Sequence, residues 1–115
     1  MEICEFNGDG YMPLTSYSGW RVALINACER LKEEKLCRME RHLTTDEVFI
    51  LLQGEATLHI GAERKRFSME RGKLYCVKCG EWHAISMQPG AKVAVVENDD
   101  VGEANSEYVY FTADT

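Results

Sequence analysis

The alternation of apolar and polar residues predicts that the chain is a series of short β-strands. Between residues 55 and 60, every second residue is apolar, which is typical of a strand with one buried face. Short strands of this kind, separated by glycine-rich or polar turns, are expected from Leu36 onward and at 20–26, 48–52, 55–60, 64–69, 74–77, 82–87, 92–97 and 108–111. Many short strands at this spacing favour an all-β barrel or a double-sheet architecture.

Three segments do not fit the strand pattern. Residues 1–19 contain three glycines and a proline and are expected to form a loop-rich lead-in, with a short strand at 3–6. Residues 27–35 have a helical composition but are too few for a stable helix, so they predict one helical turn. The acidic residues 98–107 predict a loop before the final strand.

The segment 48–52 is apolar at every position. A strand of this kind is expected to be buried on both faces, whereas a single barrel buries only one. We therefore expect a second copy of the chain to cover the other face, which predicts a homodimer.

Composition restricts the classes of partner. The 115 residues are enough for one domain, 1–115, and the net charge of -6 disfavours binding to nucleic acid or anionic membranes. Residues 1–5 lack the features of a secretion signal and no apolar run approaches eighteen residues, so a soluble, cytoplasmic protein is expected. The five cysteines are then reduced thiols, and the C-x-x-C formed by Cys76 and Cys79 is interpreted as incidental packing.

Metal-ligating residue types lie directly before the apolar strand 48–52. Glu40 and His42 share one face of an extended segment, and Glu47 follows after a short turn. With Gly54, these residues resemble the first motif of the cupin superfamily, which begins His-x-His and continues to a glutamate and a glycine. Glu40 stands where that motif has its first histidine.

A second group of residues resembles the second cupin motif. Gly72, Gly80 and His83 have the intervals of that motif, whereas Lys78 replaces its proline and Met87 its asparagine. The resemblance covers roughly residues 20 to 100 and implies a cupin-type jelly-roll β-barrel, also called a double-stranded β-helix. The periodicity of the strands independently favours the same kind of architecture.

The resemblance implies that Glu40, His42, Glu47 and His83 converge inside the barrel as metal ligands. Imidazole and carboxylate ligands suit a divalent ion such as Mn, Fe, Ni or Zn, and no nucleotide cofactor is expected. Without a metal, Glu40 and Glu47 would form a carboxylate pair in which the pKa of one member is raised, as suits catalysis by an acid and a base. His59 is expected to face away from Leu58 and Ile60 and not to be a ligand.

Three functions are consistent with these residues. The first is a metal-dependent isomerase, lyase or dioxygenase-like enzyme that acts on a small oxygen-rich molecule such as a sugar or a keto or hydroxy acid. The second is a metal-free sugar isomerase or epimerase that uses the carboxylate pair. The third is a non-catalytic module that binds a small molecule. The fold does not decide among them.

Overall fold

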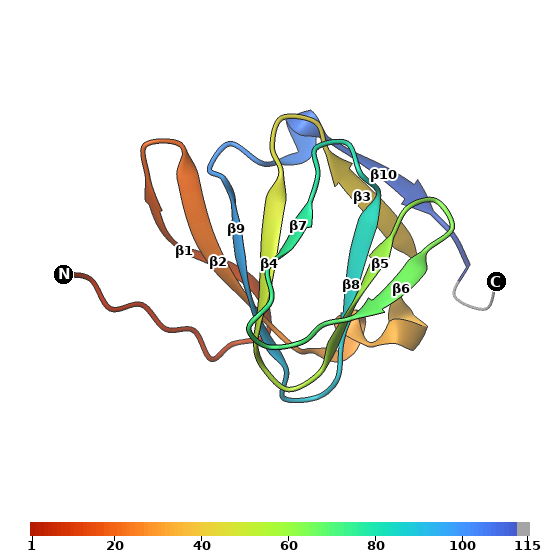
Figure 1. The fold of residues 1–115 in the computed structure, drawn as a ribbon, viewed down its shortest axis with the longest axis horizontal. Coiled ribbons are helices and arrows are strands. Elements are labelled where there is room, and N and C mark those ends of the chain that lie inside the picture. Colours follow the sequence, from red (N-terminus) through yellow and green to blue (C-terminus); the bar gives the residue numbers. More distant parts are fainter. Residues whose placement is uncertain (113–115) are drawn as a thin grey trace.

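The computed structural model describes residues 1–112, which form two five-stranded antiparallel sheets packed face to face (Figure 1). The first sheet has the strand order β1-β2-β9-β4-β7 and the second has the order β10-β3-β8-β5-β6. The strands are β1 (Gly10–Tyr17), β2 (Trp20–Asn26), β3 (Arg38–His42), β4 (Glu47–Gln53), β5 (Ala56–Ile60), β6 (Lys65–Ser68), β7 (Tyr75–Val77), β8 (His83–Met87), β9 (Lys92–Asn98) and β10 (Ser106–Tyr110). This architecture confirms the all-β jelly-roll barrel expected from the sequence.

The register of the strands determines which side chains face the interior. In β4 the buried positions are Glu47, Phe49 and Leu51, and in β9 the buried positions are Val93, Val95 and Glu97. The core lies between the two sheets because inward positions of both carry mainly apolar residues, as the period of two requires.

The N-terminal region differs from its predicted form. Residues 10–17 are not part of a loop-rich lead-in, since they form the eight-residue edge strand β1, and the predicted strand at 3–6 is absent. Pro13 had argued against a strand here. An edge strand tolerates proline, however, because one side of it makes no ladder hydrogen bonds, and the register of β1 shifts between Pro13 and Thr15.

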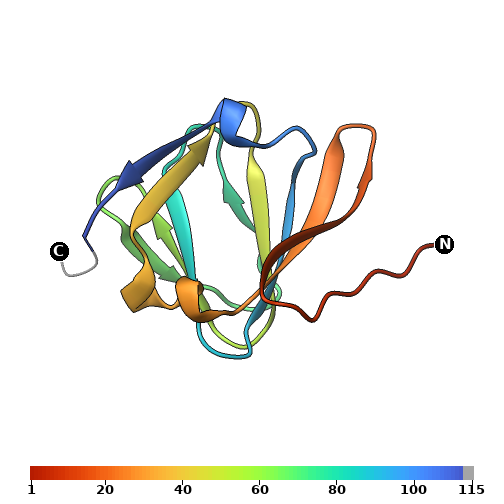
Figure 2. The ribbon, with the colours of Figure 1, turned by 180° about the vertical axis from the view of Figure 1, so that it is seen from behind.

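The connections contain three short 3₁₀ helices, η1 (Glu29–Leu31), η2 (Glu33–Lys35) and η3 (Glu103–Asn105). The first two correspond to the helical turn predicted at 27–35, and Figure 2 shows them at the lower end of β3. The predicted acidic loop at 98–107 is shorter than expected, because β10 begins at Ser106. Within residues 1–112, no helix has the length and apolar character needed to cross a membrane.

The outer face of the first sheet is apolar. Val48 and Ile50 on β4 are half-buried and Leu52 is exposed, so a single copy of the chain leaves this face of the strand partly open to solvent, whereas the sequence predicts that a second copy covers it. Register pairs Val48 with Val96, and Val96 with Val22, so that apolar side chains form a row across three strands. The helices η1 and η2 pack against β8 of the other sheet.

Candidate metal centre

The interior of the barrel changes from apolar to polar toward one end. Along β4 the inward side chains run from Leu51 and Phe49 to Glu47, and along β9 they run from Val95 to Glu97. Both glutamates are buried, with 6% and 4% of their surface exposed. Burial of carboxyl groups is costly unless charged or hydrogen-bonding partners compensate, so this end of the barrel requires specific partners.

Glu47 lies between two buried histidines. One of its carboxylate oxygens, Oε2, is 3.3 Å from Nε2 of His42, and the other, Oε1, is 2.9 Å from Nε2 of His83. Glu40 approaches from β3, where its Oε1 lies 4.0 Å from Nε2 of His83. Antiparallel pairing of β3 with β8 places Glu40 directly opposite His83 and explains this contact.

The remaining ring nitrogens of both histidines have fixed partners. Nδ1 of His83 is 3.0 Å from the backbone carbonyl of Glu81, and because a carbonyl only accepts, this nitrogen must donate. Nδ1 of His42 lies 2.8 Å from the hydroxyl of Ser106. Such partners fix the orientation of an imidazole. In the neutral ring of His83, Nε2 therefore carries a lone pair that faces the cavity.

The contact between Glu47 and His83 requires a positive charge. Oε1 of Glu47 and Nε2 of His83 are both buried and lie 2.9 Å apart, and neither atom has a hydrogen-bond partner other than this contact. Two ligand atoms at about 2.1 Å from one metal ion and at right angles to each other would lie roughly 3 Å apart, which matches this distance. The donor set and the spacing therefore fit a divalent metal ion.

The four residues predicted as ligands meet at this point. One donor atom each from Glu40, His42 and His83 lies within 4.8 Å of the others, and this Glu-His-His group could hold a metal. Glu47 joins the group through its contacts with both histidines. His59 points to the opposite face of the second sheet, where its Nε2 lies 2.8 Å from the hydroxyl of Ser86.

Sequence reasoning missed three residues beside the predicted ligands. Glu97 accepts a 2.6 Å hydrogen bond from the hydroxyl of Tyr11 and pairs with Arg21, whose Nε and Nη2 atoms lie 2.9 Å and 2.6 Å from its Oε2. The Glu47 carboxylate is close enough to raise the pKa of Glu97. Glu47 and Glu97 therefore form a carboxyl pair in the cavity that the sequence did not predict. The alternation of Val93 and Val95 along β9 places residue 97 on the inward face, so an acidic residue there was the available signal.

The two members of this pair have pKa values shifted in opposite directions. Burial, followed by the adjacent Glu47 carboxylate, raises the pKa of Glu97 to about 7, although Tyr11 and Arg21 act in the other direction. Burial would also raise the pKa of Glu47, but its hydrogen bonds with His42 and His83 outweigh burial and lower it. The pair thus contains one carboxylate and one group that gains or loses its proton near neutrality.

The histidines respond to the same carboxylate. Burial alone would lower the pKa of both His42 and His83, since a charged imidazolium is poorly solvated inside the barrel. Hydrogen bonding and charge attraction from Glu47 outweigh this effect, and the pKa of each histidine is raised. A cation, whether a proton or a metal ion, is therefore favoured between these residues.

The loop that precedes His83 is anchored by the residue next to Glu47. Asp46 accepts a 2.8 Å hydrogen bond from the backbone N–H of Cys79 and lies 3.3 Å from Nζ of Lys78. The N–H of Gly80 donates to the carbonyl of His42 at 2.8 Å. The C-x-x-C segment thus belongs to a strand-turn-strand unit, and both of its cysteines are free thiols.

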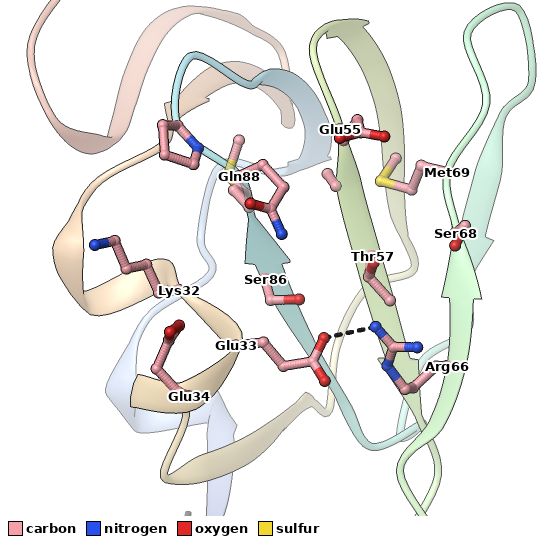
Figure 3. Close-up of a pocket in the computed structure, with 13 residues that line it drawn as sticks. Lys32, Glu33, Glu34, Glu55, Thr57, Arg66, Ser68, Met69, Ser86 and Gln88 are labelled. Carbon is pink, nitrogen blue, oxygen red and sulfur yellow. Dashed lines mark hydrogen bonds and ion pairs between the residues drawn. The ribbon is translucent and has the colours of Figure 1, made fainter.

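A cavity of about 340 Å³ contains the histidines and glutamates. A larger hollow of about 420 Å³ lies on the outer face of the second sheet, beside η2 (Figure 3). Its basic side chains are paired with acidic ones, since Arg66 lies 2.7 Å from Glu33 and Lys32 lies 2.9 Å from Glu29. Within residues 1–112, the buried unpaired imidazole and carboxylate atoms occur in the smaller, interior cavity.

Comparison with known proteins identifies the fold. The sequence matches no protein-family model and no curated protein. A cupin-2 domain-containing protein of Shewanella frigidimarina has a similar structure, with a TM-score of 0.62 and 17% identity over 81% of this chain and 84% of that chain. Pac13, a Streptomyces nucleoside dehydratase, has a TM-score of 0.65 at 9% identity over 92% of this chain and 83% of its own. KdgF from Halomonas has a TM-score of 0.59 at 10% identity over 82% and 81%.

The two sheets and the interior histidine-carboxylate group define a small β-barrel protein with a buried polar site. Its fold is that of the cupins. This result confirms the resemblance found in the sequence.

Proposed function

We propose that Glu40, His42, Glu47 and His83 bind a divalent metal ion and that a small oxygen-rich molecule binds beside it in the cavity. The observation that carries this proposal is the 2.9 Å separation of two buried atoms, Oε1 of Glu47 and Nε2 of His83, which have no partner besides each other and need a cation between or on them. The 340 Å³ volume of the cavity is at the lower end of the range for ligand pockets. A sugar or a keto or hydroxy acid has a suitable size.

The ligand set favours a hard or borderline metal ion. Two carboxylates neutralise a dication, and together with two imidazoles they suit Mn, Fe, Ni or Zn. When bound, such an ion supplies Lewis-acid chemistry that polarises a carbonyl or stabilises an enolate. In this chain, Ser106 and the carbonyl of Glu81 orient the two imidazoles, and Phe49 packs edge-on against His83 at a centroid distance of 5.9 Å. We propose an isomerase, lyase or dioxygenase-like reaction for this site.

A metal-free acid-base function is the second candidate. The observation in its favour is the pairing of Glu47 with Glu97, whose pKa of about 7 would allow it to donate or accept a proton near neutral pH. Sugar isomerisation and epimerisation need proton transfers of this kind. A protein that only binds its ligand would need neither the metal nor the carboxyl pair.

Elemental analysis of protein purified without a histidine tag or chelator tests the metal proposal. The wild-type protein is compared with His83→Ala and Glu47→Ala, before and after incubation with Mn²⁺, Fe²⁺, Ni²⁺ or Zn²⁺. His59→Ala is the matched control, because His59 and His83 are similarly buried, with 5% and 3% exposed, but lie on opposite faces of the second sheet. Circular dichroism confirms that each variant is folded.

The wild-type protein and His59→Ala should contain near-stoichiometric metal, whereas His83→Ala and Glu47→Ala should contain little. Equal loss in the two histidine variants would contradict the ligand assignment. A wild-type protein that binds none of the four ions would eliminate the metal-dependent function and leave the acid-base candidate, which requires that Glu47→Gln and Glu97→Gln each abolish activity.

We also propose that a second copy of the chain covers the outer face of the first sheet. Val22, Val48, Ile50 and Val96 form part of an apolar surface in a chain with a net charge of -6. A two-fold axis would place this surface against itself and remove it from water. Light scattering should give about twice the chain mass. Ile50→Lys should yield monomers, whereas Thr57→Lys on the outer face of the other sheet should not, and a monomeric wild type would refute the proposal.

A further inference from the structure

Exposed basic side chains line part of the cavity that contains the candidate ligands. Arg30 and Arg38 both line this cavity and are both exposed, whereas the histidines and Glu47 are buried. We call these two arginines the rim arginines. Their position between the polar interior and solvent is where an entering ligand would contact them.

Arg30 has no partner among residues 1–112, since it makes no hydrogen bond, ion pair or ring contact there. It lies in η1, and the next residue, Leu31, is buried in the core and anchors this helix. A Cβ atom at Gly10 would lie only 2.8 Å from Nη2 of Arg30, so glycine at this position leaves room for the guanidinium. Gly10 also has a φ of +79°, which disfavours other residues.

Arg38 is held in place by an aromatic ring. Its guanidinium lies 4.3 Å from the ring centroid of Tyr108 and hydrogen-bonds with Tyr110, and a guanidinium has five N–H donors, so that others can still donate to a ligand. Arg38 and Glu40 are two residues apart on the same face of β3, a separation of roughly 7 Å. One small molecule can therefore reach both Arg38 and the candidate metal ligands.

Arg41 on the same strand also lies over an aromatic ring, but it differs from Arg38 in the face that it occupies and in its ion pair. Its side chain points to the opposite face of β3, and Nε lies 2.7 Å from Oε1 of Glu107. Its guanidinium also lies 4.5 Å from the ring centroid of Trp82. Arg41 does not line the cavity and therefore serves as a matched control.

When each charged group in the cavity is paired with its neighbour of opposite charge, the charges of the cavity wall do not cancel. Arg21 pairs with Glu97, and a metal dication would be neutralised by Glu40 and Glu47. With a metal ion bound, the charged residues that remain on the cavity wall are Arg30, Arg38 and Glu103, which leave an excess of one positive charge; without the metal, the wall carries three arginines and four glutamates. An anionic ligand would remove this excess.

We infer that the ligand of this cavity is a small organic anion, whose carboxylate or phosphate group binds the rim arginines while a hydroxyl or carbonyl oxygen faces Glu40, His42, Glu47 and His83. This inference rests on the proposed function for its metal-facing end and for the excess of positive charge on the cavity wall. The rim arginines act on the anionic group whether or not a metal is bound. Guanidinium groups recognise carboxylate and phosphate oxygens through paired N–H donors.

Ligand titrations of the wild-type protein and three variants test the inference. The variants are Arg30→Gln, Arg38→Gln and the control Arg41→Gln. Malate and glycerol 3-phosphate are the carboxylate and phosphate probes, and glycerol is the neutral probe. Mn²⁺ binding is first measured by electron paramagnetic resonance, and probe binding is then followed through water proton relaxation of the Mn²⁺-loaded protein and through side-chain NMR signals of arginine in the metal-free protein.

At least one of the two anions should bind the wild-type protein about 10-fold more tightly than glycerol, and the stronger of the two identifies the anionic group. Arg30→Gln and Arg38→Gln should each weaken anion binding roughly 10-fold and leave Mn²⁺ binding intact, whereas Arg41→Gln should change neither. Normal Mn²⁺ binding with no preference for anions, or with equal anion affinity in all variants, overturns the inference but not the metal centre. If Mn²⁺ does not bind, the proposed metal function fails, and the NMR titrations of the metal-free protein decide the inference by the same criteria.

Discussion

Replacement of Glu97 by glutamine tests the carboxyl pair that the structure places in the cavity. Glu97 is buried beside Glu47, and its pKa is raised from 4.5 to about 7. The folded state therefore binds a proton more tightly than the unfolded state. The stabilisation from this proton is complete below pH 4.5 and is lost as the pH rises through about 7.

The size of the effect follows from the same values. Each tenfold change in an acid constant corresponds to about 1.4 kcal/mol, so the change from 4.5 to about 7 amounts to roughly 3 kcal/mol. Glutamine has no proton to lose, and its oxygen can accept the hydrogen bonds that Tyr11 and Arg21 donate to Glu97, while its amide donates to Glu47. Relative to the wild type, Glu97→Gln should therefore gain about 2 to 3 kcal/mol of stability between pH 5 and pH 8.

Urea denaturation at both pH values, followed by tryptophan fluorescence, measures this difference. The protein is treated with a chelator, because a bound metal ion would change the charge beside Glu47. Glu103→Gln is the control, since Glu103 is an exposed carboxyl on the same cavity. If the stability of Glu97→Gln relative to the wild type is the same at pH 5 and pH 8, the account of the Glu47–Glu97 pair is refuted.

Three further predictions concern the metal centre and its support. Ser106→Ala removes the partner of Nδ1 of His42 and should weaken metal binding about 10-fold in a competition titration with a chelator; an unchanged affinity would exclude an orienting role. Because the pKa values of His42 and His83 are raised, protons should compete with the metal, and affinity should fall between pH 8 and pH 6; a flat profile would argue against imidazole ligands. Phe49 is 4% exposed, and Phe49→Ala should lower the free energy of unfolding, measured by urea denaturation, by about 3 to 5 kcal/mol. Phe67 is 41% exposed, and Phe67→Ala should lower it much less. Similar losses in the two variants would contradict the assigned core.

The order of the strands along the chain could be predicted because alternation of side chains is a local property. Strand β2 matches the predicted range 20–26, and β8 and β9 each lie within one residue of theirs. Strand β1 was missed because its glycine and proline indicate a loop unless the strand lies at the edge of a sheet. Its position at the edge depends on pairing with β2 and is not visible in its own residues.

The predicted ligands and the missed residues differ in how far apart they lie in the sequence. His42 and Glu47 lie close together in the sequence, and His83 was predicted from the resemblance to the second cupin motif. Glu97 lies beside Glu47 because β4 pairs with β9, as the alignment of Val48 with Val96 shows. Spacing cannot indicate a neighbour fifty positions away when the pairing of the strands is unknown.

The sequence by itself determined the strand content, the inward and outward face of most strands, and the residue types able to bind a metal, since these depend on near neighbours in the chain. Only the tertiary structure decided that Glu97 shares the site with Glu47, that Arg21 neutralises it, and that Arg38 lines the cavity while Arg41 does not. The physical reason is that burial and electrostatic pairing arise between strands that are distant in the sequence. Their strength depends on separations of a few ångströms, which are fixed only when the two sheets pack.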